Sequence, residues 1–467
     1  MMAKKSSHDR RLRWLVAVVI IGGILLAGYW YLTGGASPDD RPEGTLADIE
    51  SLSERTDVNV FFVLIDTLRS DRLGSYGYDR DTSPAMDYLA LTGVRFDKHR
   101  AQSSWTKSSM ASLWSGLYPT RTDVLRHTDT VPESAELPAE ILRDAGYSTA
   151  GLWRNGWVAP NFGFSQGFDV YQSPVGQQAP ATMRSEARAG RIDGTDIDLV
   201  FTTKEFLRAN QDTRWFLYVH FMDVHQYISA EETALFGSSY SDSYDNAILW
   251  TDSQLGEILM EIYRLGLGKK TLIVVVSDHG EAFGEHGAEG HARDLFQEVV
   301  GTPFILSLPF RLPEPAVVRA HSENVDVWPT LLDMLGIPGL EGADGISHRP
   351  LLLGEKNQTE REVGFARLDR NWGRLEVEES PLIAVREGNL RLIHVVDSPE
   401  KDLLYDIGLD PREQRNIADS REEAKDRLLE KAREQMSLEP HWEGGSGSVE
   451  IDEMQLKQLR ALGYSIE

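Results

Sequence analysis

Two short, uninterrupted apolar runs constrain the fold more than any other feature of this sequence. Residues 58–65 (VNVFFVLI) and residues 272–276 (LIVVV) are both rich in β-branched side chains. Runs of this length and composition are typical of central strands in parallel sheets, which helices cover on both faces. Other segments have the patterns of helices, at residues 136–145 and 245–265, and of strands, at residues 216–219 and 304–308. Because strands and helices alternate, we predict an α/β fold with a mainly parallel sheet between helices.

The pattern changes after Gly354. Residues 381–386 and 390–396 have the pattern of short strands joined by Gly388-Asn389, which predicts a hairpin in a smaller antiparallel unit. The residues beyond this unit are charged and have a helical pattern. The expected divisions are a large domain over residues 58–354, an antiparallel carboxyl-terminal subdomain over residues 355–420 and a charged helical tail over residues 421–467.

The amino-terminal residues have the features of a membrane anchor. Residues 14–32 form an uncharged apolar run, which as a helix is long enough to cross the roughly 30 Å hydrocarbon core of a bilayer. Residues 1–13 are basic, so we expect this tail in the cytoplasm. A cleaved signal peptide is the alternative, but the run is long and no small-x-small motif follows it closely.

A polar segment without periodicity, residues 33–57, is predicted to be a linker. Together with the anchor at residues 14–32, it predicts a single-pass membrane protein. The folded part would lie outside the cytoplasm, in the periplasm if the cell is Gram-negative.

Composition excludes several classes of function. The chain of 467 residues contains no Cys, which excludes disulfides, thiolate metal sites, iron–sulfur clusters, cysteine nucleophiles and a lipoprotein signal. Its 73 acidic and 48 basic residues give a formal charge of -25. A surface this negative repels phosphate backbones, so nucleic acid is not expected as a partner. An anionic substrate would need a local cationic site, most simply a metal ion.

Three potential metal ligands follow the two apolar runs. Asp66 comes directly after the first run, and Asp278 and His279 follow the second after a single Ser. Ligand sites in parallel sheets lie outside the carboxyl ends of the strands, so these side chains are expected to converge. Two carboxylates and an imidazole suit Zn²⁺ or Mn²⁺, whereas carboxylates alone would suit Mg²⁺ or Ca²⁺. A role in a turn or helix cap is the alternative for Asp66.

A hydroxyl-rich segment at residues 103–113 begins a predicted helix. At the start of a helix, free backbone N–H groups and the helix dipole stabilise an alkoxide or another anion. Any of these hydroxyls, Thr106 included, could act as a nucleophile if a metal or a base lowers its pKa. The alternative is that Thr106 is only the helix N-cap.

A series of motifs runs from about residue 58 to the end of the chain. They are residues 62–74 (FVLIDTLRSDRLG), 76–78 (YGY), 115–119 (SGLYP), 221–225 (FMDVH), 277–281 (SDHGE), 284–287 (GEHG), 295–299 (LFQEV), 325–332 (VDVWPTLL) and 459–464 (LRALGY). Together they closely resemble the sulfatase family of the alkaline phosphatase superfamily. The resemblance implies a metal-dependent hydrolase of sulfate or phosphate esters, built as a large α/β domain with a small antiparallel carboxyl-terminal subdomain.

The resemblance also implies roles for individual residues. Asp66, Asp278 and His279 correspond to metal ligands. Thr106 stands at the position of the family's nucleophile, where it would also bind the metal. The implied cofactor is one divalent ion, with Zn²⁺ or Mn²⁺ favoured and Ca²⁺ an option.

Two histidines, His225 and His291, fall at substrate-facing positions of the family pattern. There they would hold the oxygens of the ester or protonate the leaving group, as catalytic and substrate-binding residues. Hydrogen-bonded structural histidines are the alternative for both.

The segment around Thr106 departs from the family pattern. Sulfatases usually place there a Cys or Ser that is converted to formylglycine, followed after one residue by Pro-Ser-Arg. This chain has residues 106–110 (TKSSM) instead, and because threonine cannot become formylglycine, none is expected. Lys107 could replace the charge of the missing Arg and bind the substrate; a solvated lysine is the alternative. The usual acidic pair after the first strand is Asp66-Thr67 here, which is one acidic ligand fewer.

These features predict an extracytoplasmic, metal-dependent ester hydrolase with Thr106 as its nucleophile. Its partner would be an anionic ester, with a glycan or a lipid as the candidate classes. Two other functions fit the same residues: a transferase that moves a phospho-headgroup between lipids or glycans, and an inactive relative that binds an anionic glycan.

Overall fold

The computed structural model describes residues 39–174, 176, 194–355, 361–374, 376–451, 453–461 and 466. The predicted anchor at residues 14–32 and the basic tail at residues 1–13 lie outside these ranges. Within them, no helix combines the length and the apolar character needed to cross a bilayer.

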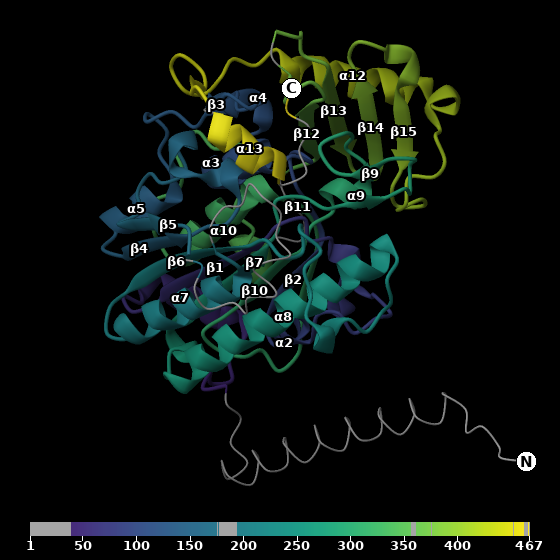
Figure 1. Cartoon of the computed structure of the whole chain (residues 1–467). Helices are drawn as coiled ribbons and strands as arrows, with labels where there is room; N and C mark the ends of the chain where they lie inside the picture. The colour runs from purple at the N-terminus through teal and green to yellow at the C-terminus, as the bar shows by residue number, and fades with distance from the viewer. Residues whose placement is uncertain are drawn as a thin grey trace, which may run out of the picture.

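The large domain contains an eight-stranded sheet in the order β11-β2-β10-β7-β1-β6-β4-β5 (Figure 1). Its strands are β1 (Asn59–Ile65), β2 (Val94–Arg100), β4 (Ser148–Leu152), β5 (Val170–Gln172), β6 (Trp215–Phe221), β7 (Thr271–Val276), β10 (Phe304–Ser307) and β11 (Ala316–Glu323). In the part of the chain that the structure describes, β10 alone runs against its neighbours β7 and β2. The predicted mainly parallel sheet is therefore confirmed.

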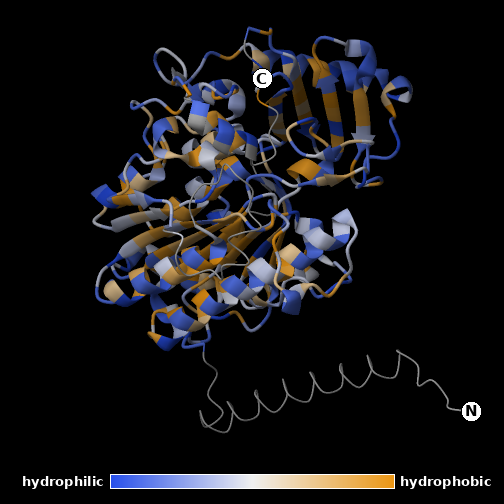
Figure 2. Ribbon diagram, viewed as in Figure 1, coloured by the Kyte–Doolittle hydropathy of each residue, from blue (hydrophilic) through white to orange (hydrophobic). Residues whose placement is uncertain are grey.

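Alternate residues of β1 belong to two different hydrophobic cores. Phe62 and its neighbours two positions away pack in one core, whereas Phe61, Val63 and Ile65 pack in the other. Successive side chains of a strand point to opposite faces of the sheet. Both faces are therefore covered by apolar side chains, as the continuous apolar run predicts, and Figure 2 shows the central strands in orange.

Helices form a layer on each face of the sheet (Figure 1). One layer contains α2 (Pro84–Leu91), α7 (Asp196–Ala209) and α8 (Tyr240–Arg264). The other contains α3 (Thr106–Ser115), α5 (Pro138–Asp144) and α10 (Val327–Met334). Helix α8 begins five residues before the predicted start because Ser239 caps it: the Ser239 side chain accepts a hydrogen bond from the backbone N–H of Asp242.

The carboxyl-terminal subdomain is a four-stranded antiparallel sheet covered by a helix. Its elements are β12 (Val363–Asp369), β13 (Pro381–Glu387), β14 (Leu390–Val395), β15 (Leu403–Asp406) and α12 (Glu422–Met436). Leu428 of α12 packs with Ile383 and Leu392 of the sheet. The predicted hairpin is confirmed, but α12 belongs to the subdomain and not to a separate tail.

Short elements connect these layers. They are α4 (Pro119–Thr122), α9 (Gln297–Val300), α11 (Arg349–Leu352), α13 (Glu453–Ala461), β3 (Asp129–Thr130), β8 (Ala282–Phe283), β9 (Glu289–Gly290) and β16 (Gly447–Ser448). Strand β16 pairs with β3. The chain therefore returns from the subdomain to the large domain, where α13 contacts the 3-10 helix η4 (Gly156–Val158).

The segment predicted as a linker, residues 33–57, is packed against the large domain from Asp39 onward. Buried Arg41 forms an ion pair of 2.7 Å with Asp39 and donates a hydrogen bond to the carbonyl of Leu308. A 3-10 helix, η1 (Leu46–Glu54), buries Ile49 and Leu52 completely. The linker prediction is therefore wrong for the described part of this segment. The sequence does not reveal this packing, because the two buried apolar residues, Ile49 and Leu52, stand among many polar ones.

This packing predicts that Leu52 contributes to stability. We expect Leu52→Ala to lower the free energy of unfolding by about 2–5 kcal/mol, because it empties a fully buried position. The matched control is Glu50→Ala in the same helix, which is exposed and should change stability by less than about 0.5 kcal/mol. Urea denaturation of both variants measures the free energy of unfolding. Equal midpoints for the two variants would indicate that residues 39–57 are a tether after all.

Candidate active site

Four of the predicted site residues meet at the carboxyl edge of the large sheet. Asp66 follows β1, and Asp278 and His279 follow β7, which pairs with β1 in parallel. Thr106 is the first residue of α3. All four side chains are completely buried.

Asp66, Asp278 and His279 form a group that could hold a metal ion, since one ligand atom from each lies within 4.8 Å of the others. Oδ1 of Asp66 and Oδ2 of Asp278 are buried without a hydrogen-bond partner among the described residues. Burying an unpaired carboxylate oxygen is costly unless a cation compensates for it. The donor set therefore fits a divalent cation.

The tautomer of His279 also suits a metal ligand. Its Nδ1 lies 2.9 Å from the carbonyl oxygen of Gly280, which can only accept a hydrogen bond, so Nδ1 carries the proton. The lone pair of Nε2 then points into the site, 3.3 Å from Oδ2 of Asp278. A hydrogen bond on the far nitrogen is the usual way in which a protein orients a histidine ligand.

The hydroxyl of Thr106 lies among the candidate ligands. Its Oγ1 is 3.1 Å from Nε2 of His279, and Nδ2 of Asn155 lies 3.4 Å from the same oxygen. The N-cap residue of α3 is Trp105, and no side chain makes a cap hydrogen bond. The alternative that Thr106 is only an N-cap is therefore wrong.

Asp66 is fixed by two donors to which the sequence analysis assigns no role. Asn155 donates to its Oδ2 at 2.6 Å, and Nε2 of His220 lies 3.0 Å from the same atom. The hydroxyl of Tyr218 bonds to the other nitrogen of His220 at 2.7 Å. Burial alone would raise the pKa of Asp66, but the hydrogen bond from His220 helps to lower it. Asp66 is therefore a carboxylate with Oδ1 left for a cation.

A signal for Asn155 and His220 exists in the sequence. His220 is the sixth residue of the apolar strand β6, and Asn155 follows β4 by three residues. Both strands are parallel neighbours in the sheet that carries Asp66. The rule that predicts the metal ligands, polar residues at the carboxyl ends of adjacent parallel strands, would have found both.

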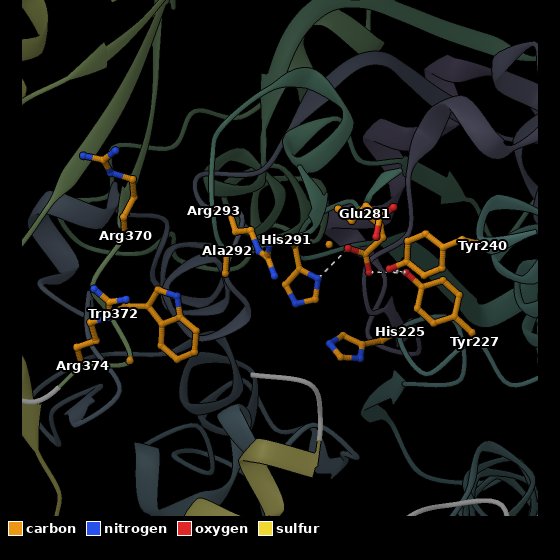
Figure 3. A pocket seen from close by; sticks show the side chains of 13 residues that line it. His225, Tyr227, Tyr240, Glu281, His291, Ala292, Arg293, Arg370, Trp372 and Arg374 are labelled. Carbon is orange, nitrogen blue, oxygen red and sulfur yellow. Dashed lines mark hydrogen bonds and ion pairs between the residues drawn. The ribbon is translucent and has the colours of Figure 1, made fainter. Parts of the chain in front are cut away.

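His225 and His291 lie close together beside the candidate metal ligands. Their ring centroids are 5.0 Å apart, and those of His279 and His291 are 4.5 Å apart. Nδ1 of His291 pairs with Oε1 of Glu281 at 3.1 Å, as Figure 3 shows. Burial lowers the pKa of His225 to about 4. Burial acts in the same direction on His291, but the Glu281 carboxylate outweighs it and raises the pKa of His291.

A cavity of about 570 Å³ opens in front of these histidines. Arg293 lies beside His291, and the far side of the cavity carries Arg370, Trp372 and Arg374 from the turn after β12 (Figure 3). Arg293 is exposed. Arg370 pairs with Asp397 at 3.0 Å. The carboxyl-terminal subdomain thus supplies cationic groups to a pocket whose reactive end belongs to the large domain.

Lys107 does not line this cavity, so its predicted role in substrate binding is wrong. Its Nζ donates to the carbonyls of His127 at 2.5 Å and Asp129 at 2.7 Å and lies 4.1 Å from the centroid of Phe162. Burial lowers its pKa well below the ordinary value. Successive helical residues are rotated by about 100°, which explains why Lys107 and Thr106 face different surroundings.

Three non-glycine residues with positive φ border the site. They are Thr67 (φ 60°), Tyr227 (φ 54°) and Ala292 (φ 58°). The backbone N–H of Thr67 donates to Oδ1 of Asp278 at 3.2 Å, so its conformation connects the loops after β1 and β7. Strained backbone of this kind occurs where the surrounding structure must fix functional groups.

Comparison with known proteins agrees with this arrangement. The sulfatase family model matches residues 58–337, and a model described as N-sulphoglucosamine sulphohydrolase, C-terminal, matches residues 284–438. The first match alone covers more than half of the chain.

Individual relatives span most of the chain. Choline-sulfatase of Rhizobium meliloti is 23% identical over 78% of this chain and 82% of its own length. N-acetylgalactosamine-6-O-sulfatase of Bacteroides thetaiotaomicron is 24% identical over 77% of this chain and 89% of its own. The solved structure of phosphonate monoester hydrolase of Agrobacterium radiobacter has the same fold, with a TM-score of 0.65 at 21% identity over 84% of this chain and 100% of that one. The chain therefore belongs to the sulfatase family of the alkaline phosphatase superfamily and is a sulfuric ester hydrolase.

Proposed function

We propose that this enzyme cleaves its ester by nucleophilic attack of the Thr106 hydroxyl, with Asp66, Asp278 and His279 holding a divalent ion. The observation that carries the proposal is the pair of partnerless buried carboxylate oxygens beside that hydroxyl. When bound, the ion would lower the pKa of the hydroxyl and neutralise the charge that develops on the ester oxygens. Zn²⁺ or Mn²⁺ suits the two carboxylates and one imidazole best, and Ca²⁺ is the alternative.

The proposed reaction has two steps. In the first, the Thr106 hydroxyl gives its proton to solvent water, Oγ1 forms a bond to the sulfur or phosphorus atom, and the bond to the leaving alcohol breaks. His291, whose pKa is raised by Glu281, donates a proton to the leaving oxygen. In the second step, a water molecule gives a proton to His291 and attacks the sulfur or phosphorus atom, the bond to Oγ1 of Thr106 breaks, and Oγ1 regains a proton from solvent. Asn155 orients both the nucleophile and Asp66.

The nucleophile bears on the choice between sulfate and phosphate esters. A formylglycine hydrate can expel sulfate by breakdown of its own hemiacetal, whereas a threonine sulfate must wait for water to attack sulfur. A phosphorylated threonine carries more negative charge, which a metal ion can stabilise. We therefore expect that phosphate esters turn over faster than sulfate esters at this site.

The shape and charge of the pocket favour a glycan as the rest of the substrate. The cavity runs from the histidines to Arg293, Arg370 and Arg374, which could bind a second anionic group of an extended molecule. One curated relative is named for a sulfated amino sugar, N-acetylgalactosamine-6-O-sulfate. An anionic glycan ester is therefore the proposed substrate class.

We also propose that residues 14–32 anchor the enzyme in a membrane with its folded part outside the cytoplasm. The first described residue, Asp39, packs near Arg41, which contacts the carboxyl end of antiparallel β10. This edge of the sheet is the one where β1 begins. Asp66 lies at the opposite end of β1, about 23 Å away for seven residues. The pocket would then face away from the bilayer, which favours glycans over lipid headgroups of the same membrane.

The transferase and the inactive relative remain the rival functions. A transferase would share the covalent threonine and differ only in its acceptor, so a modified acceptor alcohol would identify it. An inactive binder would not need a nucleophile and three ligands brought together in one buried group. Metal-dependent turnover by the purified protein would show that it is a catalyst and not an inactive binder.

The first prediction concerns Thr106. Thr106→Ala should lower kcat by at least about 10³-fold while keeping the fold and the metal, and Thr106→Ser should retain part of the rate. Ser108→Ala is the matched control, because Ser108 is a buried hydroxyl of the same helix that lies outside the reaction. Turnover of aryl sulfate, phosphomonoester, phosphodiester and phosphonate substrates measures the effect. Near-normal kcat in Thr106→Ala would remove Thr106 from the mechanism.

A second prediction concerns the metal ligands. Asp278→Asn and His279→Ala should each lose bound metal, because the remaining donors can no longer neutralise and enclose a divalent ion. His291→Ala should keep the metal but lose activity, since this residue is assigned to the leaving group. Elemental analysis of the purified proteins gives the occupancy. Full occupancy in both ligand variants would contradict the assignment.

A third prediction concerns the anchor. Protease added to spheroplasts that express the full chain should digest the folded part, and a cytoplasmic protein in the same cells should stay intact as the control. The catalytic domain should sediment with the membrane fraction. Protection of the folded part, or a mature protein that begins after residue 32, would contradict the anchor.

A further inference from the structure

A second, much smaller cavity lies where the large sheet meets the carboxyl-terminal subdomain. It is lined by Arg100 at the end of β2, Glu323 at the end of β11, Arg386 of β13 and Arg391 of β14. Its volume is about 10 Å³, which is room for one particle of about the size of a water molecule. None of these residues belongs to the catalytic pocket.

Arg386 is the exceptional residue of this cavity. Its side chain is 4% exposed, and its Nε and Nη2 are buried without a hydrogen-bond partner among the described residues. The carboxylate of Glu323 lies 3.8 Å from Nη2, but its other oxygen already accepts from Tyr118 at 2.6 Å and Arg361 at 3.0 Å. Nη1 of Arg386 donates to the carbonyl of Glu362 at 3.3 Å, but leaving the two other nitrogens buried without an acceptor is costly.

The two other arginines are held in place by neutral groups or by a carboxylate of their own. Arg100 donates to Gln297 at 3.0 Å. Arg391 pairs with Glu413 and donates to the carbonyl of Leu295. Burial, together with the positive charges of Arg391 and Arg386, lowers the pKa of Arg100 to about 9. The arginines therefore repel one another at short range.

The buried charges around the cavity do not balance. Among the described residues that line the cavity, three are arginines and only one, Glu323, is an acid, whereas Arg391 has Glu413 as a carboxylate partner outside the lining. Burial and the nearby Arg386 lower the pKa of His321, so this histidine is neutral and does not change the charge around the cavity. Within this lining, Arg100 and Arg386 have only the carboxylate of Glu323 between them, and Glu323 also pairs with Arg361. A water molecule in the cavity could accept hydrogen bonds but could not neutralise the remaining positive charge.

We propose that this cavity binds one small monovalent anion, with chloride as the natural occupant, between Arg386 and Arg100. The size of the cavity excludes tetrahedral sulfate or phosphate, so the site does not serve for the reaction product. The wall formed by β12 comes close to it, since a side chain at Gly364 would collide with Glu323 and Arg386. The bound anion would stabilise the contact between the large domain and the subdomain that carries Arg370 and Arg374.

The test measures the Tm of the metal-loaded full chain in sodium gluconate, with chloride replacing gluconate at constant ionic strength. We expect a saturable rise in Tm of about 2–5 °C, reproduced by bromide. Arg386→Met should abolish this rise and should melt in gluconate at or above the temperature of the unsubstituted protein, because it removes a repelling charge. Arg293→Met is the matched control: it removes an arginine from the catalytic pocket and should keep the chloride effect.

Each alternative gives a different result. A Tm that is the same in gluconate and chloride, or a chloride effect that persists in Arg386→Met, would overturn the proposal. A chloride effect lost in Arg293→Met would place the anion in the catalytic pocket instead and would equally overturn it. If Arg386→Met does not fold, bromide-soaked crystals of the unsubstituted protein decide the question. An anomalous peak beside Arg386 supports the site, and its absence there indicates water.

Discussion

The parallel pairing of β1 with β7 brings two carboxylates into one buried space, and the surrounding structure must stabilise them there. Its register places Leu64 beside Val276, so that the residues just beyond each strand, Asp66 and Asp278, enter one small buried space. Burial raises the pKa of Asp278, and the nearby charge of Asp66 raises it further. Two such carboxylates repel each other unless a cation lies between them. The surrounding donors, from Asn155, His220 and the Thr67 backbone, satisfy only part of their oxygens.

The site is rigid because every group in it is attached to a central element. Thr106 begins a helix whose ten residues are all buried, and Asn155 and His220 come from the two strands beyond β1. Tyr218 orients His220, and the carbonyl of Gly280 orients His279. A threonine side chain has few rotamers. The hydroxyl is therefore already directed toward the ligands in the folded protein, which reduces the reorganisation that the reaction requires.

The sequence predicts the sheet, and the meeting of the three candidate ligands at its edge, for one physical reason. Continuous apolar runs mark strands buried on both faces, and the polar residues that follow such strands must gather at one edge. Asp66, Asp278 and His279 are found by this argument.

The sequence argument fails where the direction of a side chain depends on its rotation about a helix, or where a contact joins residues far apart in the chain. Lys107 is next to Thr106 in sequence but points to the carbonyls of His127 and Asp129. Residues 39–57 are polar enough to resemble a tether, although two apolar side chains fix them to the core. No local pattern indicates that Arg370 and Arg374, some 300 residues from Asp66, share a pocket with His291.

The division of the pocket between two units has an evolutionary consequence. The reactive groups are built into the central sheet, where a substitution disturbs buried charges and the core. In the turn after β12, Arg370 and Arg374 are exposed, although Trp372 between them is buried, and exposed loop positions tolerate changes of residue. Substitution of Arg370 and Arg374 could therefore change the preferred substrate during evolution, while the reactive groups of the central sheet stay the same.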